Sequence, residues 1–381
     1  MRKDVPMSVR KLIVEIDLEG LNVTEFCRQH GVSRWLFYQL RKRYAAYGDA
    51  GLEPRSRAPK TVPNRTPDWV EDVIVELRKQ LSDDGFDAGP ATIRYHLGQR
   101  VDDSEVPSEA TIWRILVRRG FITPEPKKAP KHAHRRFAAE RANECWQLDD
   151  IEWELVDGTG VEIISIIDDC TRFSPMIKAV ETVNGDTAFA AFAAGGNESG
   201  FPERFLSDNA TEYRYTLARA VGALGVDHGH GRPNHPQTQG KVERFQQTLQ
   251  KWLTAQTTAE TLKELQTQLD TFRDIYNNIR PHRAIGRKPP ATVYATTPRS
   301  GPKDRPLGTP TSIHTVTVSN GVVYINKQYT ITIGAKYNTQ TATVIITGTS
   351  CHIFIGATLT RQLQLNPTRR TQPLYNRPGK P

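Results

Sequence analysis

The N-terminal residues place apolar side chains at the spacing of α-helices. Residues 8–46 predict three short helices. Thr24 and Ser33 are candidate N-caps for the second and third helix, and Gly31 supplies the turn between them. The third helix has an apolar stripe of Leu36, Phe37, Leu40 and Tyr44. A short helix, a glycine turn and a second helix with a basic outer face are typical of a helix-turn-helix, although a plain helical hairpin has the same pattern.

A second group of helical patterns spans residues 68–121. Its first helix has an apolar stripe of Trp69, Val73, Ile74 and Leu77. Another helix starts after Pro90, and the last one starts at Ser108 and has an apolar face of Ile112, Ile115 and Leu116. We interpret this group as a second helix-turn-helix, and two such units in tandem can contact a longer DNA site than one.

The pattern changes to strands after residue 143. Three strand-like runs, at 144–156, 161–168 and 172–181, are separated by short turns. Helices and two short strands then alternate, and the segment ends in two long helical stretches at 241–252 and 259–278. This order predicts a mixed α/β domain with five strands.

The C-terminal part of the chain predicts an all-β region. Asn320 and Gly321 lie between alternating β-branched residues, which is a strong signal for a hairpin. Further strand-like runs follow up to residue 359, so we expect a small β-barrel. The last residues are basic and contain few apolar side chains, which is typical of a disordered tail.

These patterns divide the chain into eight segments. They are a helix-turn-helix DNA-binding domain at 1–47, a basic Pro/Gly-rich linker at 48–67, a second helix-turn-helix domain at 68–122, a basic linker at 123–142, an α/β domain at 143–295, a linker at 296–310, a small β-barrel at 311–362 and a basic disordered tail at 363–381.

Composition narrows the class of partner. The 381 residues include 51 Lys and Arg against 42 Asp and Glu, a net charge of +9 that favours a polyanion such as nucleic acid. The four cysteines show no metal-ligand spacing, so we expect reduced thiols and no zinc site. No apolar run approaches the roughly 20 residues that cross a bilayer, and the N-terminus does not resemble a signal peptide. We therefore expect a cytoplasmic protein with no membrane partner.

Three carboxylates are candidates for a metal site. Asp149 lies within an apolar strand-like run, and Asp208 ends another. Glu243 lies on the polar face of a helix, where an ordinary surface glutamate would look the same. Buried acids that converge without a matching base repel one another, and divalent cations relieve that repulsion. Asp150 and Asp169 are expected to face solvent or to be hydrogen-bonded rather than to bind metal.

The segments that contain these acids carry a family resemblance. WQLDD, LSDNATEY and HPQTQGKVERF, in this order, resemble the catalytic signature of DDE transposases with a retroviral-integrase-like core. The resemblance is strongest to bacterial insertion-sequence transposases, and SIIDDCTRFSP and YNNIRPHRAIGRKPPATVY are similar to segments of that group. It covers roughly residues 143–294, and the helical and β regions on either side fit the layout of the group.

The resemblance implies a fold and a mechanism. Residues 143–295 would form a ribonuclease-H-like catalytic core, in which Asp149, Asp208 and Glu243 are the catalytic and metal-binding triad. Two Mg²⁺ ions per active site are implied, and Mn²⁺ can substitute for them.

Basic and polar side chains on the predicted helices, linkers and catalytic loop are candidate DNA contacts. They are Arg34, Tyr38, Arg41, Lys42, Arg55, Arg57, Arg114, Arg118, Arg119, His235, Gln237, Lys241, Arg244, Arg280 and Arg283.

The sequence thus predicts a DNA transposase that binds the terminal inverted repeats of a mobile element. It would hydrolyse phosphodiesters at the element ends and join the exposed 3′-OH groups to target DNA by Mg²⁺-dependent transesterification. Double-stranded DNA of the element ends and the target would be its partner, in the bacterial nucleoid. Joining two ends requires at least a homodimer. Two alternatives remain: a transposase-derived DNA-binding regulator, or a nuclease that cuts without joining.

Overall fold

The computed structural model describes residues 5–54, 65–125, 139–207, 214–230, 240–303 and 311–374, apart from the side chains of residues 214 and 230. The chain forms two compact units, Met1–Arg65 and Thr66–Pro381. No helix among the described residues is long and apolar enough to cross a membrane.

The first unit contains the three expected helices. They are α1 (Met7–Glu15), α2 (Val23–Gln29) and α3 (Arg34–Tyr47), followed by the 3₁₀ turn η1 (Gly48–Leu52). Their core is Ile13, Phe26, Cys27, Val32, Phe37, Leu40 and Leu52. Gly31 adopts a φ of +63°, and the Ser33 hydroxyl accepts a hydrogen bond from the Leu36 N–H at 3.2 Å, as expected. These features define a helix-turn-helix.

Two details of this unit differ from the expectation. The cap of α2 is Asn22, whose side chain accepts from the N–H groups of Thr24 and Glu25. Thr24 itself lies inside the helix. Tyr44 is 39 % exposed because Leu52, which follows α3 in η1, completes the core in its place.

The second unit begins with another three-helix arrangement. It consists of α4 (Asp68–Asp83), α5 (Pro90–Leu97), the 3₁₀ turn η2 (Asp103–Glu105) and α6 (Glu109–Arg118). Ser108 caps α6 through the Thr111 N–H at 3.3 Å. The core stripe of α4 is Val70, Ile74, Leu77 and Leu81. Trp69, expected in that stripe, is 48 % exposed.

The central domain is built on the predicted mixed sheet of five strands. These are β1 (Cys145–Glu154), β2 (Gly160–Asp168), β3 (Met176–Val180), β4 (Arg204–Ser207) and β5 (Asp227–His230). Their order is β3-β2-β1-β4-β5. The β1–β2 and β2–β3 pairs are antiparallel, and the β1–β4 and β4–β5 pairs are parallel.

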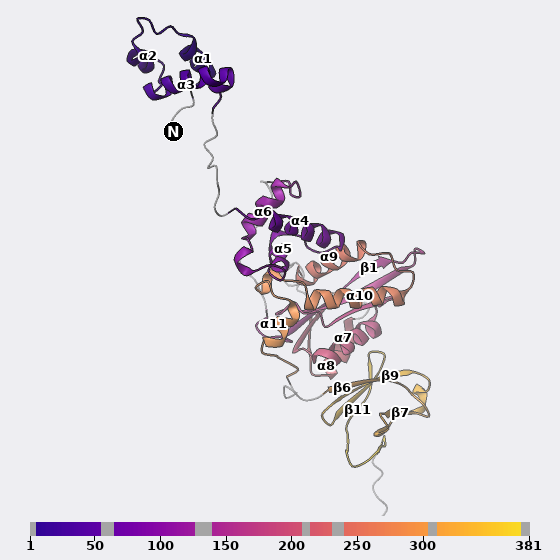
Figure 1. The fold of residues 1–381 in the computed structure, drawn as a ribbon. Helices are drawn as coiled ribbons and strands as arrows, with labels where there is room; N and C mark the ends of the chain where they lie inside the picture. The colour runs from indigo at the N-terminus through magenta and orange to yellow at the C-terminus, as the bar shows by residue number, and fades with distance from the viewer. Residues whose placement is uncertain are drawn as a thin grey trace, which may run out of the picture. The chain divides into compact units, whose positions relative to one another are not determined.

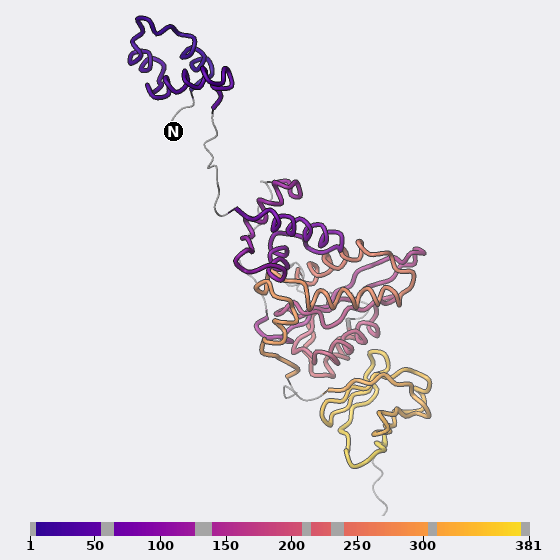
Figure 2. Tube along the Cα trace, in the orientation of Figure 1, coloured from indigo at the N-terminus to yellow at the C-terminus, as the bar shows by residue number. Residues whose placement is uncertain are grey.

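Helices cover both faces of this sheet (Figures 1 and 2). The helices α7 (Gly185–Ser199) and α8 (Arg214–Ala223) share one apolar core with the sheet. On the opposite face, α9 (Gly240–Thr254) and α10 (Leu262–Asn278) share a second core with it. The 3₁₀ turn η3 (Arg283–Ile285) and the short helix α11 (Pro290–Thr296) follow α10.

The α4–α6 helices contact the α9–α10 layer. Lys251 Nζ of α9 donates to the Phe86 carbonyl at 2.6 Å, and the Phe86 and Trp252 rings lie 6.5 Å apart. Ion pairs join Arg280 to Asp87 and, between η3 and α6, Arg287 to Glu109. The second helix-turn-helix is therefore packed against the helical layer of the central domain.

The C-terminal region is all-β, as expected, but its described strands form two sheets and no closed barrel. The four-stranded sheet has β6 (Thr311–Thr317), β9 (Thr341–Thr347), β10 (Ser350–Ile355) and β11 (Thr358–Gln364), and the three-stranded sheet has β7 (Val322–Ile325), β8 (Tyr329–Thr332) and β12 (Thr371–Gln372). A 3₁₀ turn, η4 (Ala335–Tyr337), follows β8. Since β12 pairs with β8, the predicted tail is ordered at that point.

The expected hairpin turn at Asn320 and Gly321 exists, but the strands on either side of it belong to different sheets. Both residues have a positive φ. The β7–β8 hairpin instead turns at Asn326 and Lys327, which also adopt a positive φ. The β region shares the core of α7 and α8, where the Phe354 and Phe189 ring centroids are 4.6 Å apart.

Candidate active site

The two faces of β1 separate its adjacent acids. Trp146 and Leu148 pack into the core beneath α7 and α8, whereas Ile151 and Trp153 pack against the core beneath α9 and α10. Since successive strand residues point to opposite faces, Asp149 lies on the face covered by α9 and Asp150 lies on the other. Strand alternation therefore distinguishes two acids that the sequence places side by side.

Helix α9 presents Glu243 from its first turns. Its buried stripe contains Val242, Phe245, Leu249, Trp252 and Leu253, as the helical spacing predicts. Glu243 lies off this stripe and is exposed, and α9 packs on β1 and β2. The structure thus places Asp149 and Glu243 on elements that pack together on one face of the sheet.

The third predicted acid, Asp208, lies outside the described residues, as do His235 and Gln237. The chain reaches Asp208 directly after β4, which ends at Ser207. Strand β4 runs parallel to β1, with Leu206 opposite Gln147, two residues before Asp149. Within the described part of the chain there is no group of three His, Cys, Asp or Glu side chains that could hold a metal ion.

The surroundings of Asp149 suit a hard cation. Ser165 lies opposite Asp149 on the neighbouring strand β2. The Ser165 hydroxyl is buried and has no hydrogen-bond partner. The side-chain oxygen of Gln147, on the same face of β1, also lacks a partner. Mg²⁺ prefers carboxylate and neutral oxygen ligands, so this oxygen-rich donor set fits it.

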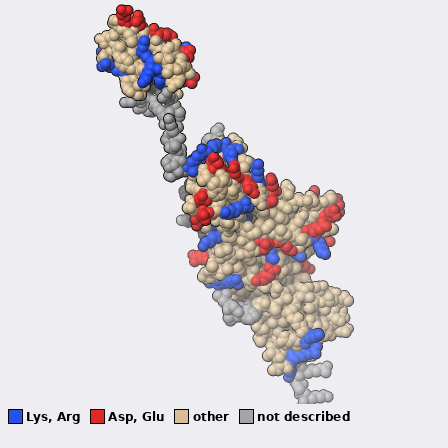
Figure 3. All heavy atoms as spheres, viewed as in Figure 1, with Lys and Arg blue, Asp and Glu red and all other residues tan. Residues whose placement is uncertain are grey.

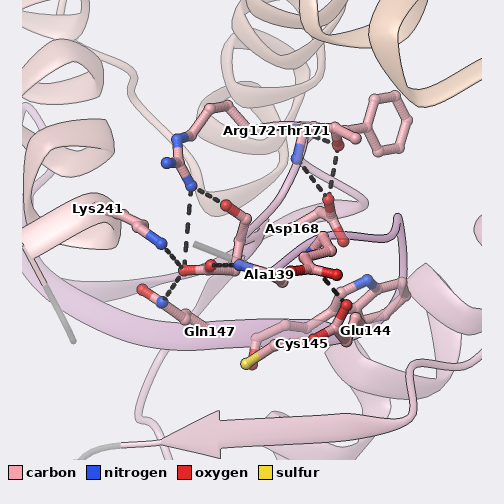
Figure 4. Close-up of polar contacts among 12 residues, drawn as sticks. Ala139, Glu144, Cys145, Gln147, Asp168, Thr171, Arg172 and Lys241 are labelled. Carbon is pink, nitrogen blue, oxygen red and sulfur yellow. Dashed lines mark hydrogen bonds and ion pairs between the residues drawn. The ribbon is translucent and has the colours of Figure 1, made fainter. Parts of the chain in front are cut away.

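A buried polar cluster around Asp169 joins β1, the end of β2 and α9. The Asp169 carboxylate accepts from Gln147 Nε2 at 2.6 Å and from the Ala139 N–H at 2.7 Å, and it forms an ion pair with Lys241 Nζ. Arg172 Nη1 lies 4.0 Å from the same carboxylate. The side-chain ends of Lys241, Gln147 and Arg172 point toward one another (Figure 4). Asp169 is therefore hydrogen-bonded, which was one of the two expected environments.

The neighbouring acid, Asp168, has a separate set of partners. Its carboxylate accepts from the Asn143 N–H at 2.8 Å and from the Thr171 N–H and hydroxyl at 2.8 and 2.7 Å. It is fully buried, and burial raises the pKa of its carboxyl group. The bonds from Thr171 close the turn between β2 and β3, and the bond from Asn143 joins that turn to the segment before β1.

Burial also shifts the pKa of several other groups near the site. It lowers the pKa of Lys241, and the Asp169 carboxylate opposes that shift. It raises the pKa of the Cys145 thiol to about 12, so this cysteine is not a nucleophile near neutral pH. Burial lowers the pKa of His282 to about 3, and the nearby Arg280 and Arg172 add to the effect, so this imidazole is neutral.

Several predicted DNA contacts form bonds within the protein. Arg41 Nη1 donates to the carbonyls of Ile13 and Ile16 at 2.9 and 2.8 Å. Arg118 and Arg119 form ion pairs with Glu71 and Asp72 of α4, Arg280 pairs with Asp87, and Lys241 pairs with Asp169. Figure 3 shows basic and acidic side chains next to each other over the α4–α6 helices.

The other predicted contacts that are described lie on the surface. They are Arg34, Tyr38, Lys42, Arg114, Arg244 and Arg283. Arg55 and Arg57 lie outside the described residues. Two exposed tryptophans were not among the predicted contacts: Trp35 on α3 (71 % exposed) and Trp113 on α6 (41 %). The signal that could have found them is their position outside the apolar stripe of each helix.

Three family models match parts of this chain. One described as "Integrase core domain" matches residues 224–290, which contain α9 and α10. One described as "Homeodomain-like domain" matches residues 36–116, and one described as "Helix-turn-helix domain" matches residues 10–60. These matches agree with the helix-turn-helix units and with the central domain seen in the structure.

One relative and two solved structures complete the comparison. The "Insertion element IS476 uncharacterized 39.2 kDa protein" of Xanthomonas euvesicatoria is 24% identical over 187 residues, which cover 47% of this chain and 53% of the relative. The chain thus spans about half the length of that relative. A chain of the simian T-cell lymphotropic virus intasome with PP2A regulatory subunit B56 gamma is 15% identical, with a TM-score of 0.38, and the match covers 73% of this chain and all of that one. The HTLV-2 integrase catalytic core with magnesium is 14% identical, with a TM-score of 0.33, and the match covers 40% of this chain and 97% of that one.

The family models and the insertion-element relative confirm the resemblance expected from the motifs. The chain resembles insertion-sequence transposases that combine helix-turn-helix domains with an integrase-like core.

Proposed function

We propose that this chain is a DNA transposase whose central domain cuts the ends of a mobile element and joins them to target DNA. In this proposal Asp149, Asp208 and Glu243 form the catalytic triad. The observation that carries the proposal is the placement of Asp149 and Glu243 on β1 and α9, which pack together on one face of the sheet. Asp208 follows directly after β4, the parallel neighbour of β1.

The three carboxylates would hold divalent metal, Mg²⁺ in the first place. When bound, two such ions lower the pKa of an attacking water and stabilise the leaving oxygen of the phosphodiester. The protein's own contribution is to hold the acids in position and to bind and orient the DNA. The unpartnered oxygens of Gln147 and Ser165 beside Asp149 support an oxygen-rich site for a hard cation.

DNA recognition would fall to the two helix-turn-helix units. In such motifs the second helix enters the major groove and contacts the bases with its N-terminal residues. In α3 these residues include Arg34 and Trp35, and in the middle of α6 Trp113 and Arg114 are also exposed. Arg118 and Arg119 pair with acids of α4, so we assign them a weaker role in DNA contact than Arg114.

The proposal is tested with purified full-length protein, labelled element-end DNA, a plasmid target and Mg²⁺. The expected result is cleavage at the end and joining of the 3′-OH to the plasmid. Asp149→Asn and Glu243→Gln should each abolish both steps and leave DNA binding intact. Asp150→Asn is the matched control: it changes the adjacent acid on the opposite face of β1, and it should retain activity.

The outcomes separate the alternatives. DNA binding without cleavage by the unmodified protein would indicate a regulator derived from a transposase. Cleavage without joining would indicate a nuclease. Loss of activity in Asp150→Asn together with full activity in Asp149→Asn would show that the strand faces have been assigned the wrong way round.

Joining two element ends requires two active sites, so we propose that the protein acts as a dimer or larger assembly on DNA. The measurement is the mass of the complex formed on paired element ends, by light scattering. A single chain bound to two ends would contradict this part of the proposal.

A further inference from the structure

We propose that Asp169 is a positioning residue that holds β1 and α9 together, so that Asp149 and Glu243 keep the separation their shared site requires. The inference rests on the proposed function. It adds a residue to the catalytic machinery that neither binds metal nor contacts DNA.

Asp169 lies in a buried environment. Its side chain is only 8% exposed, and both of its carboxylate oxygens are occupied. Oδ1 accepts from Gln147 Nε2 at 2.6 Å and is the oxygen that pairs with Lys241, and Oδ2 accepts from the Ala139 N–H at 2.7 Å. A carboxylate with all of these donors around it is held in one orientation and has little capacity left to bind a cation.

The two side-chain partners of Asp169 lie close in sequence to the candidate catalytic acids. Gln147 precedes Asp149 by two residues on the same face of β1, because strand side chains alternate. Lys241 precedes Glu243 by two residues in the first turn of α9. Asp169 therefore contacts each candidate catalytic element through a residue that precedes its carboxylate by two positions in the sequence.

The contact between Asp169 and Lys241 restrains the orientation of α9. Two residues of helix correspond to a rotation of about 200° and a rise of about 3 Å. When Lys241 points into the protein toward Asp169, Glu243 is directed away from that contact. The apolar stripe, which begins at Val242, seats the helix on the sheet, and the ion pair adds a second point that fixes the rotation and the axial position of its first turn.

Lys241 is poorly placed for the phosphate contact expected from the sequence. Its side chain is 17% exposed, and its ammonium group is engaged by Asp169. A buried ion pair that loses one partner leaves an uncompensated charge, so Lys241 can reach DNA only at the expense of Asp169. The geometry favours an internal role for it.

The test measures joining, DNA binding and local stability in the full-length protein with labelled element ends. The variants are Asp169→Asn, Lys241→Gln, the double variant and the conservative Lys241→Arg. We expect each of the first two to lower the rate of joining at saturating DNA about 10- to 100-fold, the size of effect expected when reacting groups move by about 1 Å. The double variant should be no slower than the slower single variant, because both changes remove one contact. Lys241→Arg should recover part of the rate.

Two readouts other than activity separate positioning from other roles. DNA affinity and its dependence on salt should be unchanged in Lys241→Gln, whereas loss of a phosphate contact would reduce the salt slope by about one. Hydrogen exchange should rise in the second turn of α9 in both single variants, because its N–H groups bond to the carbonyls of the first turn. It should rise there even if the unmodified protein joins no DNA, which separates failure of the proposed function from failure of this inference.

The neighbouring Asp168 provides the matched control. It is a buried acid of the same turn, but it bonds to Asn143 and Thr171 and not to α9. Asp168→Asn should lower the melting temperature without increasing hydrogen exchange in the second turn of α9. The inference is overturned if Asp169→Asn and Asp168→Asn have the same profile, if the effects of Asp169→Asn and Lys241→Gln multiply, or if Lys241→Gln changes the salt slope.

Discussion

Gly85 and Gly120 should respond very differently to alanine, although both follow a helix of the second helix-turn-helix unit with the same backbone conformation. Gly85 follows α4 with a φ of +77°, and Gly120 follows α6 with a φ of +80°. A Cβ at Gly85 would lie 2.9 Å from both Trp252 Cα and Ala255 Cβ. A Cβ at Gly120 would meet nothing within 4 Å. The two variants share the backbone strain, but only Gly85→Ala collides with the α9 segment.

The expected magnitude follows from these two terms. A left-handed backbone destabilises an alanine by about 1–2 kcal/mol, and this term should be nearly equal in both variants. Overpacking adds about 1–3 kcal/mol in Gly85→Ala. The atoms it meets belong to the backbone and a Cβ, so no rotation of a side chain can remove the collision. The difference between the variants should therefore be about 1–3 kcal/mol in the free energy of unfolding.

The assay is denaturant unfolding of the full-length protein, combined with hydrogen exchange resolved to peptides of α4 and α9. Gly85→Ala should increase exchange at the end of α4 and in the last turns of α9, and Gly120→Ala should increase it only around α6. Equal unfolding free energies and equal exchange in α9 would refute the packing of the loop after α4 against α9.

Three further predictions test other parts of the structure. Asn22→Ala should destabilise the first helix-turn-helix by about 1 kcal/mol through loss of the α2 cap, and Thr24→Ala should destabilise it less. The measurement is thermal unfolding, and a larger loss of stability in Thr24→Ala would indicate that Thr24 is the cap. The folded protein keeps His282 neutral, with a pKa of about 3, whereas the unfolded chain takes up a proton below about pH 6.5, so stability should fall as the pH falls below that value. His282→Gln should flatten this dependence. Identical curves of unfolding free energy against pH for the unmodified protein and the variant, between about pH 6.5 and about pH 5, would contradict the prediction. Phe354→Ala should destabilise the protein by about 3–5 kcal/mol, because its buried ring joins β10 to α7. Tyr324→Ala, which changes a half-exposed aromatic residue, should destabilise it far less. Equal losses of stability by calorimetry would contradict the core shared by the β region and α7.

Features set by local periodicity could be predicted from the sequence. The five apolar residues of α9 are all buried, because a strongly amphipathic helix has only one face that can pack on the sheet. The five strands of the central sheet and the caps at Ser33 and Ser108 were predictable for the same reason, since each depends on a few neighbouring residues.

Features that depend on tertiary packing could not be predicted from the sequence. In α4 the apolar residues allow more than one stripe, and contacts with α5 and α6 decide that Val70 is buried and Trp69 exposed. The β7–β8 hairpin turns at Asn326 and Lys327, and a lysine with a positive φ carries no recognisable turn signal. The pairing of Asp169 with Lys241 joins residues 72 positions apart, so it depends on how α9 is seated on the sheet.

Helix α9 connects these observations, because its two ends have different tasks. Glu243 lies near its beginning, and Lys251 and Trp252 near its end contact the loop after α4. At 1.5 Å per residue, Glu243 and Lys251 are about 12 Å apart along the axis. The buried stripe fixes the helix on the sheet between these points. Under the proposed function, the same helix therefore holds a catalytic acid at one end and the second DNA-binding unit at the other. DNA held by that unit would lie at a defined distance from the site, and this arrangement requires no flexible connection between recognition and chemistry.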